Sequence, residues 1–267
     1  MKNPVRVLSS FAIAFSMLIS LSATKLVEIR QVDNQYIMVC FKDGDVFYRD
    51  DGTGASAYDG HAYAPVDDSL HQYGENLNLE VVTDLQTWRI TSLTDKNYGG
   101  KGKYPEAVFR KSKVMNSNHD WDYEFDHWIF LKLPEPLKQG EGYQLEIAKK
   151  TNTDKTSVSF TFDVYNILSE AIHVNMIGYV PGAPIKSADL YLWLGDGGQR
   201  DYSGFLGKKV WLKDMVSGDI HETGEVTFWK KSAEEYRGWN MTGSDVWNID
   251  FSSFSKPGRY KLIVEDV

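Results

Sequence analysis

An acidic run at residues 118–128, NHDWDYEFDHW, holds the densest group of chemically active side chains in the sequence. Alternate residues of an extended strand face opposite sides. One face would therefore carry four carboxylates, those of Asp120, Asp122, Glu124 and Asp126. Neighbouring carboxylates would lie about 6.6 Å apart, because a strand rises about 3.3 Å per residue. Such crowding is expected to raise the pKa of at least one carboxyl group.

Three interpretations of this run remain open. In the first, the run is a solvated acidic edge with aromatic side chains packed beneath it. In the second, the carboxylates hold a hard cation such as calcium, which prefers oxygen ligands. In the third, two of them hydrolyse glycosides as a carboxylate pair. No other cofactor is expected.

Aromatic side chains are candidates for sugar binding, because they make up 13% of the chain and can stack against sugar rings. Tyr236 and Trp239 lie in the loop-like run YRGWNM and are the candidate sugar-binding residues. The other tryptophans of the C-terminal region lie in strand-like patterns, so we expect them in the core. They are Trp193, Trp211, Trp229 and Trp247.

Other reaction classes find little support in the sequence. The single cysteine, Cys40, lies in an apolar β-prone run, which predicts a buried thiol with no disulfide. There is no Gly-x-Ser-x-Gly elbow for serine catalysis, no metal-type histidine spacing and no glycine-rich phosphate loop. The net charge of −8 argues against nucleic-acid binding, which favours a basic surface.

The N-terminus has the pattern of a secretory signal peptide over residues 1–23. Lys2 and Arg6 supply positive charge, residues 7–21 are largely apolar, and small residues precede Ala23. The apolar stretch is short for a membrane span of about 20 residues. We therefore expect a secreted or periplasmic bacterial protein with no stable membrane span.

Short β-prone runs separated by turn residues follow, which predicts an all-β fold of two β-sandwich domains. The first domain is expected at residues 24–165 and belongs to no assigned family; the second is expected at 170–267. The short connector predicts that the domains touch. Within the first domain, residues 77–82 and 128–133 are predicted strands, and Asp43-Gly44 is a predicted hairpin turn.

The last hundred residues resemble the immunoglobulin-like domain that precedes the catalytic domain in glycoside hydrolase family 9 enzymes, cellulases and their relatives. The resemblance covers about residues 171–267. Its landmarks occur in order: HVNMIGY at 173–179, Pro181, Pro184, DFSSF at 250–254 and PGRY at 257–260. In the family these residues shape strands and turns.

The resemblance implies that this chain is the secreted, non-catalytic N-terminal portion of a polysaccharide hydrolase acting on β-glucan or cellulose. Its partner would be a catalytic (α/α)6 barrel downstream of residue 267, which it would brace or position. The family's catalytic Asp-Ala-Gly-Asp motif is absent, so no catalytic residue carries over. Two alternatives stay open: a stand-alone polysaccharide-binding protein, and a β-sandwich glycosidase that uses residues 120–126. The sequence does not name the glycan.

Overall fold

The computed structural model describes residues 23–47, 69–117, 121–234, 236–239 and 241–267. Within them the regular secondary structure is mostly strand with very little helix, which confirms the predicted all-β fold. The predicted signal peptide lies outside the described residues except for Ala23. One α-helix, α1 (Leu79–Val82), accompanies seven short 3-10 turns in the described part of the chain: η1 (Leu85–Thr87), η2 (Lys96–Tyr98), η3 (Lys149–Thr151), η4 (Gly195–Gly197), η5 (Ser203–Phe205), η6 (Ser232–Glu234) and η7 (Tyr236–Gly238). None of the described helices has the length and apolar character needed to cross a bilayer.

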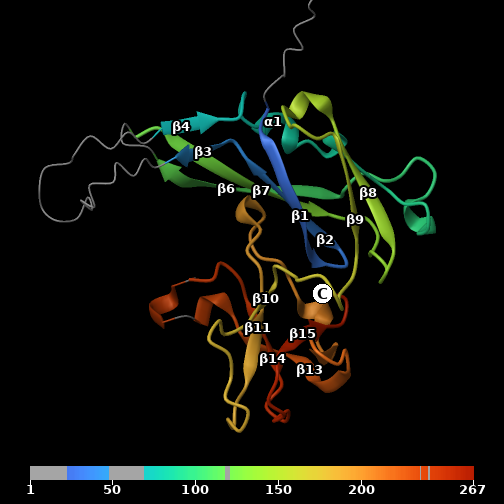
Figure 1. Ribbon diagram of the computed structural model, residues 1–267, viewed down its shortest axis with the longest axis vertical. Coiled ribbons are helices and arrows are strands. Elements are labelled where there is room, and N and C mark those ends of the chain that lie inside the picture. The colour runs from blue at the N-terminus through green and yellow to red at the C-terminus, as the bar shows by residue number, and fades with distance from the viewer. Residues whose placement is uncertain (1–22, 48–68, 118–120, 235, 240) are drawn as a thin grey trace, which may run out of the picture.

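The N-terminal sandwich, residues 23–165, is built from antiparallel sheets with the strand orders β1-β2-β7-β6 and β5-β8-β9. A two-stranded ribbon, β3-β4, extends from it (Figure 1). The strands are β1 (Lys25–Asp33), β2 (Tyr36–Lys42), β3 (Gly44–Phe47), β4 (Ser69–Gln72), β5 (Trp88–Thr91), β6 (Ala107–Ser117), β7 (Tyr123–Lys132), β8 (Gly142–Ile147) and β9 (Ser157–Thr161).

The C-terminal sandwich, residues 168–267, contains the remaining strands in the order β10-β11-β14-β13-β12-β15. They are β10 (Ile172–His173), β11 (Ser187–Leu190), β12 (Lys209–Asp214), β13 (Ile220–Lys230), β14 (Val246–Asp250) and β15 (Tyr260–Val264). The long strand β13 pairs with β12 over its first half and with β14 over its second half. It therefore joins the two sheets of the sandwich.

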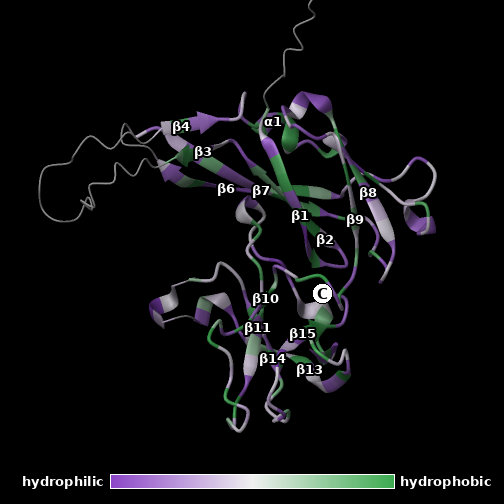
Figure 2. Ribbon diagram, viewed as in Figure 1, coloured by the Kyte–Doolittle hydropathy of each residue, from purple (hydrophilic) through white to green (hydrophobic). Residues whose placement is uncertain are grey.

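Strand β2 connects the cores of the two sandwiches. Its first six residues are all buried, which explains why its sequence is a continuous apolar run instead of an alternating one. Ile37 and Val39 pack into the N-terminal core. Met38 and Cys40 point the other way, into a cluster that includes Leu190 and Trp247 of the C-terminal sandwich. The hydropathy colouring of Figure 2 shows the hydrophobic middle of β2.

Polar contacts join the two sandwiches, as expected from the short connector between them. Arg200 is buried in the interface, where its Nε donates to Asp33 Oδ2 at 2.8 Å and its guanidinium lies over the ring of Tyr36. Gln31 Nε2 donates to the backbone oxygen of Val267 at 2.9 Å. Figure 1 shows residue 267 between the two sandwiches. The chain is therefore one packed unit over its described residues.

Three local predictions were wrong or incomplete. Asp43-Gly44 does not form a hairpin, because β2 pairs with β1 and β7 while β3 pairs with β4; Asp43 is buried. Residues 77–82 are not a strand, since the Asn78 side chain caps α1 by accepting from the backbone N–H of Val81. Strand β6 was not predicted at all.

Candidate binding surface on the C-terminal sandwich

The acidic run at 118–128 is only partly a strand. Residues 118–120, including Asp120, lie outside the described part, and β7 begins after Asp122, at Tyr123. Glu124 and Asp126 alternate with Phe125 and His127 as predicted. Among the described residues, no group of three or more histidine, cysteine, aspartate or glutamate side chains has the geometry of a metal site.

Glu124 and Asp126 differ from the solvated edge that the sequence suggested. Glu124 is buried, and its Oε1 lies 2.9 Å from Lys42 Nζ. Burial raises the pKa of both carboxyl groups, and the positive charge of Lys42 opposes that shift. Asp126 Oδ1 is buried without a hydrogen-bond partner. The pair is thus a partly desolvated acidic site next to one lysine.

Tyr236 begins the short turn η7, and Trp239 directly follows that turn, beyond the end of β13. Both side chains are exposed, and the guanidinium of Arg237 lies over the Tyr236 ring at 5.2 Å from its centre. The backbone N–H of Trp239 donates to the carbonyl of Tyr236 at 3.3 Å. The two aromatic side chains stay candidates for sugar stacking.

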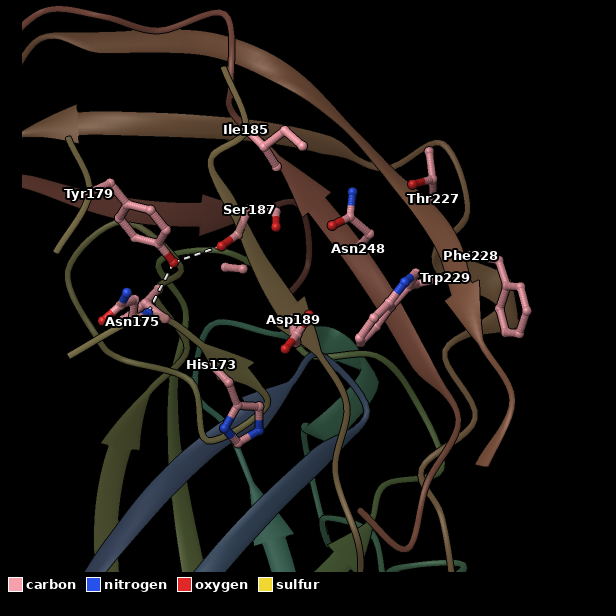
Figure 3. A pocket seen from close by; sticks show the side chains of 12 residues that line it. His173, Asn175, Tyr179, Ile185, Ser187, Asp189, Thr227, Phe228, Trp229 and Asn248 are labelled. Carbon is pink, nitrogen blue, oxygen red and sulfur yellow. Dashed lines mark hydrogen bonds between the residues drawn. The ribbon is translucent and has the colours of Figure 1, made fainter. Parts of the chain in front are cut away.

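A pocket that the sequence did not reveal lies on the outer face of the sheet β10-β11-β14-β13 (Figure 3). Its volume is about 700 Å³. Asp189, Asn248 and Thr227 form a row across its floor, because Asn248 is the register partner of both others. Trp229, which we expected in the core, is 59% exposed and lines one side. Trp193, also expected in the core, is exposed as well. The pocket combines a polar floor with an aromatic wall.

His173 and the turn that follows it close the other side of this pocket. The His173 ring stacks on Tyr191 with 4.0 Å between ring centres. Tyr179 donates its hydroxyl proton to the carbonyl of Ser187 at 2.7 Å and accepts from the backbone N–H of Asn175 (Figure 3). Burial raises the pKa of Asp189, although His173 partly offsets this. These contacts hold the turn in one shape beside the pocket.

The loop between β10 and β11 exposes a group of large apolar side chains. Met176 and Ile177 are almost fully exposed, and three further residues of the loop are also exposed: Val174, Val180 and Ile185. The loop extends away from the N-terminal sandwich (Figure 1). Its turn needs Gly178, which has a φ of 102° and donates its N–H to the carbonyl of Asn175. We call these five side chains the apolar loop surface.

Residues 168–267 match the model of the cellulase N-terminal ig-like domain family. No family model of a catalytic domain matches the chain. No curated protein matches the chain. The match coincides with the C-terminal sandwich and with the region of the predicted resemblance, so the predicted immunoglobulin-like domain of the cellulase type is confirmed. The apolar loop surface, the pocket and the Tyr236–Trp239 turn all lie within the matched residues.

Proposed function

We propose that this protein is the secreted, non-catalytic N-terminal portion of a family 9-like polysaccharide hydrolase, in which the C-terminal sandwich braces the catalytic domain. The family match at residues 168–267 carries this proposal. An immunoglobulin-like domain of the cellulase type implies a catalytic partner in the parent enzyme. The signal-peptide pattern of residues 1–23 supports an extracellular location.

The apolar loop surface supports a bracing role. Exposed apolar patches on soluble proteins mark contact surfaces, because hydrating them costs free energy that a partner would recover. Tyr179 and Gly178 fix the backbone of the loop, so little conformational entropy would be lost on docking. The N-terminal sandwich, held by Arg200 and Asp33, would then keep a fixed orientation relative to that partner.

Reconstitution in trans tests the proposal. The catalytic domain encoded in the same or the neighbouring reading frame would be expressed separately and mixed with this chain. We expect a complex in analytical ultracentrifugation and a higher unfolding temperature of the catalytic domain. Ile177→Ser combined with Met176→Ser should abolish both, while Leu93→Ser, at an exposed position of the N-terminal sandwich, should not. Absence of a hydrolase domain in that region of the genome would refute the proposal.

A second function, glycan binding, is favoured by the pocket beside Trp229. Sugar rings stack on exposed aromatic side chains and hydrogen-bond to carboxylate and amide groups, and Asp189 and Asn248 supply such groups on the floor. The Tyr236–Trp239 turn is the alternative platform. A polysaccharide would be the ligand in either case.

Affinity electrophoresis distinguishes the two platforms. Mobility would be compared in gels containing cellulose derivatives, xylan, mixed-linkage glucan or laminarin. Trp229→Ala should remove retardation if the pocket binds the glycan, whereas Trp239→Ala should remove it if the turn does. Trp121→Ala is a matched control, since this tryptophan is exposed in the N-terminal sandwich. Unchanged mobility of the wild-type chain in all gels would exclude glycan binding as the function.

A further inference from the structure

We infer that the N-terminal sandwich carries a serine–histidine–aspartate triad, formed by Ser112, His127 and Asp43, with the chemistry to cleave carboxylic esters. This site is independent of the proposed function, in which the chain takes no part in polysaccharide hydrolysis itself. Ser112 Oγ lies 2.7 Å from His127 Nδ1, and His127 Nε2 lies 2.9 Å from Asp43 Oδ2. The three side chains thus form one continuous hydrogen-bonded chain.

The sheet brings these residues together from distant parts of the sequence. Ser112 on β6 is the register partner of His127 on β7. Asp43 follows β2, which is paired with the other side of β7, and its backbone N–H donates to the carbonyl of Phe125 at 3.1 Å. The ring of Phe125 lies parallel to the imidazole, with an interplanar angle of 11°. The histidine is therefore held by hydrogen bonds to Ser112 on one side of β7 and to Asp43 on the other.

Asp43 is the ionised end of this hydrogen-bonded series of side chains. Burial alone would raise the pKa of its carboxyl group, but hydrogen bonds outweigh burial and lower the pKa below its ordinary value. His127, the Thr24 hydroxyl at 2.7 Å and the backbone N–H of Leu77 at 3.0 Å donate these bonds. An ionised carboxylate can only accept, so His127 Nε2 carries a proton. In the neutral imidazole, Nδ1 is then the acceptor.

Ser112 is the reactive end of the same hydrogen-bonded series. Arg110 Nη1 donates to Ser112 Oγ at 2.7 Å, and arginine cannot accept a hydrogen bond. The hydroxyl proton of Ser112 therefore points to His127 Nδ1. Compared with the usual serine-protease arrangement, the imidazole is turned so that Nδ1 faces the serine, but either ring nitrogen can act as the base.

Access and charge favour attack at Ser112. β6 is the edge strand of its sheet, and Ser112 and Arg110 are half-buried, while His127 and Asp43 are buried. Ser112 lies on the same face of the sheet as His127 but at the sheet edge, so the serine is partly exposed while its base is buried. Arg110 Nη1 lies 2.7 Å from Ser112 Oγ, so a fixed positive charge stands close to the atoms on which negative charge would develop during attack, and it would stabilise that charge.

The reaction is a two-step acyl transfer to water. Ser112 Oγ forms a bond to the ester carbonyl carbon while its proton moves to His127 Nδ1. The bond between that carbon and the alkoxy oxygen breaks, and the leaving alcohol takes the proton from Nδ1. Water then attacks the acyl-serine, gives a proton to Nδ1, and releases the carboxylic acid as that proton returns to Ser112 Oγ.

Labelling with diisopropyl fluorophosphate tests the triad. Ser112 Oγ would displace fluoride from phosphorus, and peptide mass spectrometry would locate the adduct. We expect stoichiometric labelling at Ser112 and hydrolysis of p-nitrophenyl acetate above the buffer rate. Ser112→Ala should remove both signals. His127→Gln should slow both by at least about 100-fold, the usual contribution of a general base, with the fold checked by circular dichroism.

Ser69→Ala is the matched control, because Ser69 Oγ also lies 3.0 Å from a histidine, His71, but in an exposed pair. This variant should keep wild-type labelling and hydrolysis. Folded wild-type protein with no label at Ser112 would overturn the inference and leave the network a purely structural link between strands. Equal labelling of Ser112 and Ser69, unaffected by His127→Gln, would also overturn it.

Discussion

The two sandwiches differ in the kind of side-chain cluster that each one carries. The N-terminal sandwich contains buried ionisable groups with polar partners: Asp43 bonds to the buried His127, and the buried Asp95 bonds to the exposed Lys138. The C-terminal sandwich exposes apolar ones, such as Ile177 in the loop after β10. Buried polar networks hold side chains in fixed geometry, whereas exposed apolar side chains favour contact with a partner. From this comparison we infer that the N-terminal sandwich holds reactive groups and that the C-terminal sandwich provides contact surfaces for a partner.

The largest effect on stability is expected where the two sandwiches meet. Arg200→Ala would leave the carboxylate of Asp33 buried without its cation, which costs about 3–5 kcal/mol of the free energy of unfolding. Urea denaturation followed by tryptophan fluorescence would measure this loss. Arg237→Ala, at an exposed position, is the control and should change little. An equally stable Arg200→Ala protein would show that the sandwiches do not depend on this ion pair.

A smaller loss is expected within the C-terminal sandwich at Gly224. This residue lies where β13 passes from one sheet to the other, and a Cβ atom there would come within 2.7 Å of the backbone oxygen of Asp250. Gly224→Ala should therefore cost about 1–3 kcal/mol, the usual range for overpacking. Thermal unfolding would measure it. Gly142→Ala has open space and should remain near wild type; equal effects would exclude steric overlap as the cause.

The sequence predicted the elements that depend on local pattern. The predicted strand at 128–133 falls almost entirely within β7, and the apolar run around Cys40 located β2 and its buried thiol. It did not locate β6, because that edge strand carries Arg110 and two lysines, charges that are typical of exposed edges and mask the strand pattern.

The site residues were harder to predict because they depend on long-range contacts. Asp43 and His127 are 84 positions apart and meet only through the pairing of β2 with β7. In the sequence alone, Asp43 before Gly44 could be interpreted equally well as a turn residue. Trp229 was expected in the core, but a register shift in β13 between Phe228 and Lys230 disturbs the alternation there, and the side chain is exposed. Neither arrangement has a local sequence signal.

A modest gain in stability is expected from Asp126→Asn, which tests the cost of buried charge in the N-terminal sandwich. Burial raises the pKa of Asp126, so the folded chain binds its proton more tightly than the unfolded chain. The ionised form therefore lowers stability above the folded pKa, and the cost disappears below the unfolded pKa of about 3.9. We expect a gain of up to about 1 kcal/mol at pH 7 that vanishes near pH 3.

Urea midpoints measured from pH 3 to pH 8 would follow the effect of Asp126→Asn. Exposed Glu75→Gln is the control and should show no such trend. A loss of stability at neutral pH would mean that attraction to Lys42 outweighs the burial of Asp126.

The smallest effect on stability is expected for Ile177→Ser, and this variant bears most directly on the contrast between the two sandwiches. The Ile177 side chain is 97% exposed, so its removal should change the free energy of unfolding by less than about 0.5 kcal/mol. Binding of a hydrophobic dye such as 8-anilinonaphthalene-1-sulfonate should fall, because the apolar loop surface shrinks. A clear loss of stability would mean that this loop contributes to the fold of the chain, and the surface would no longer be available as a contact site for a partner.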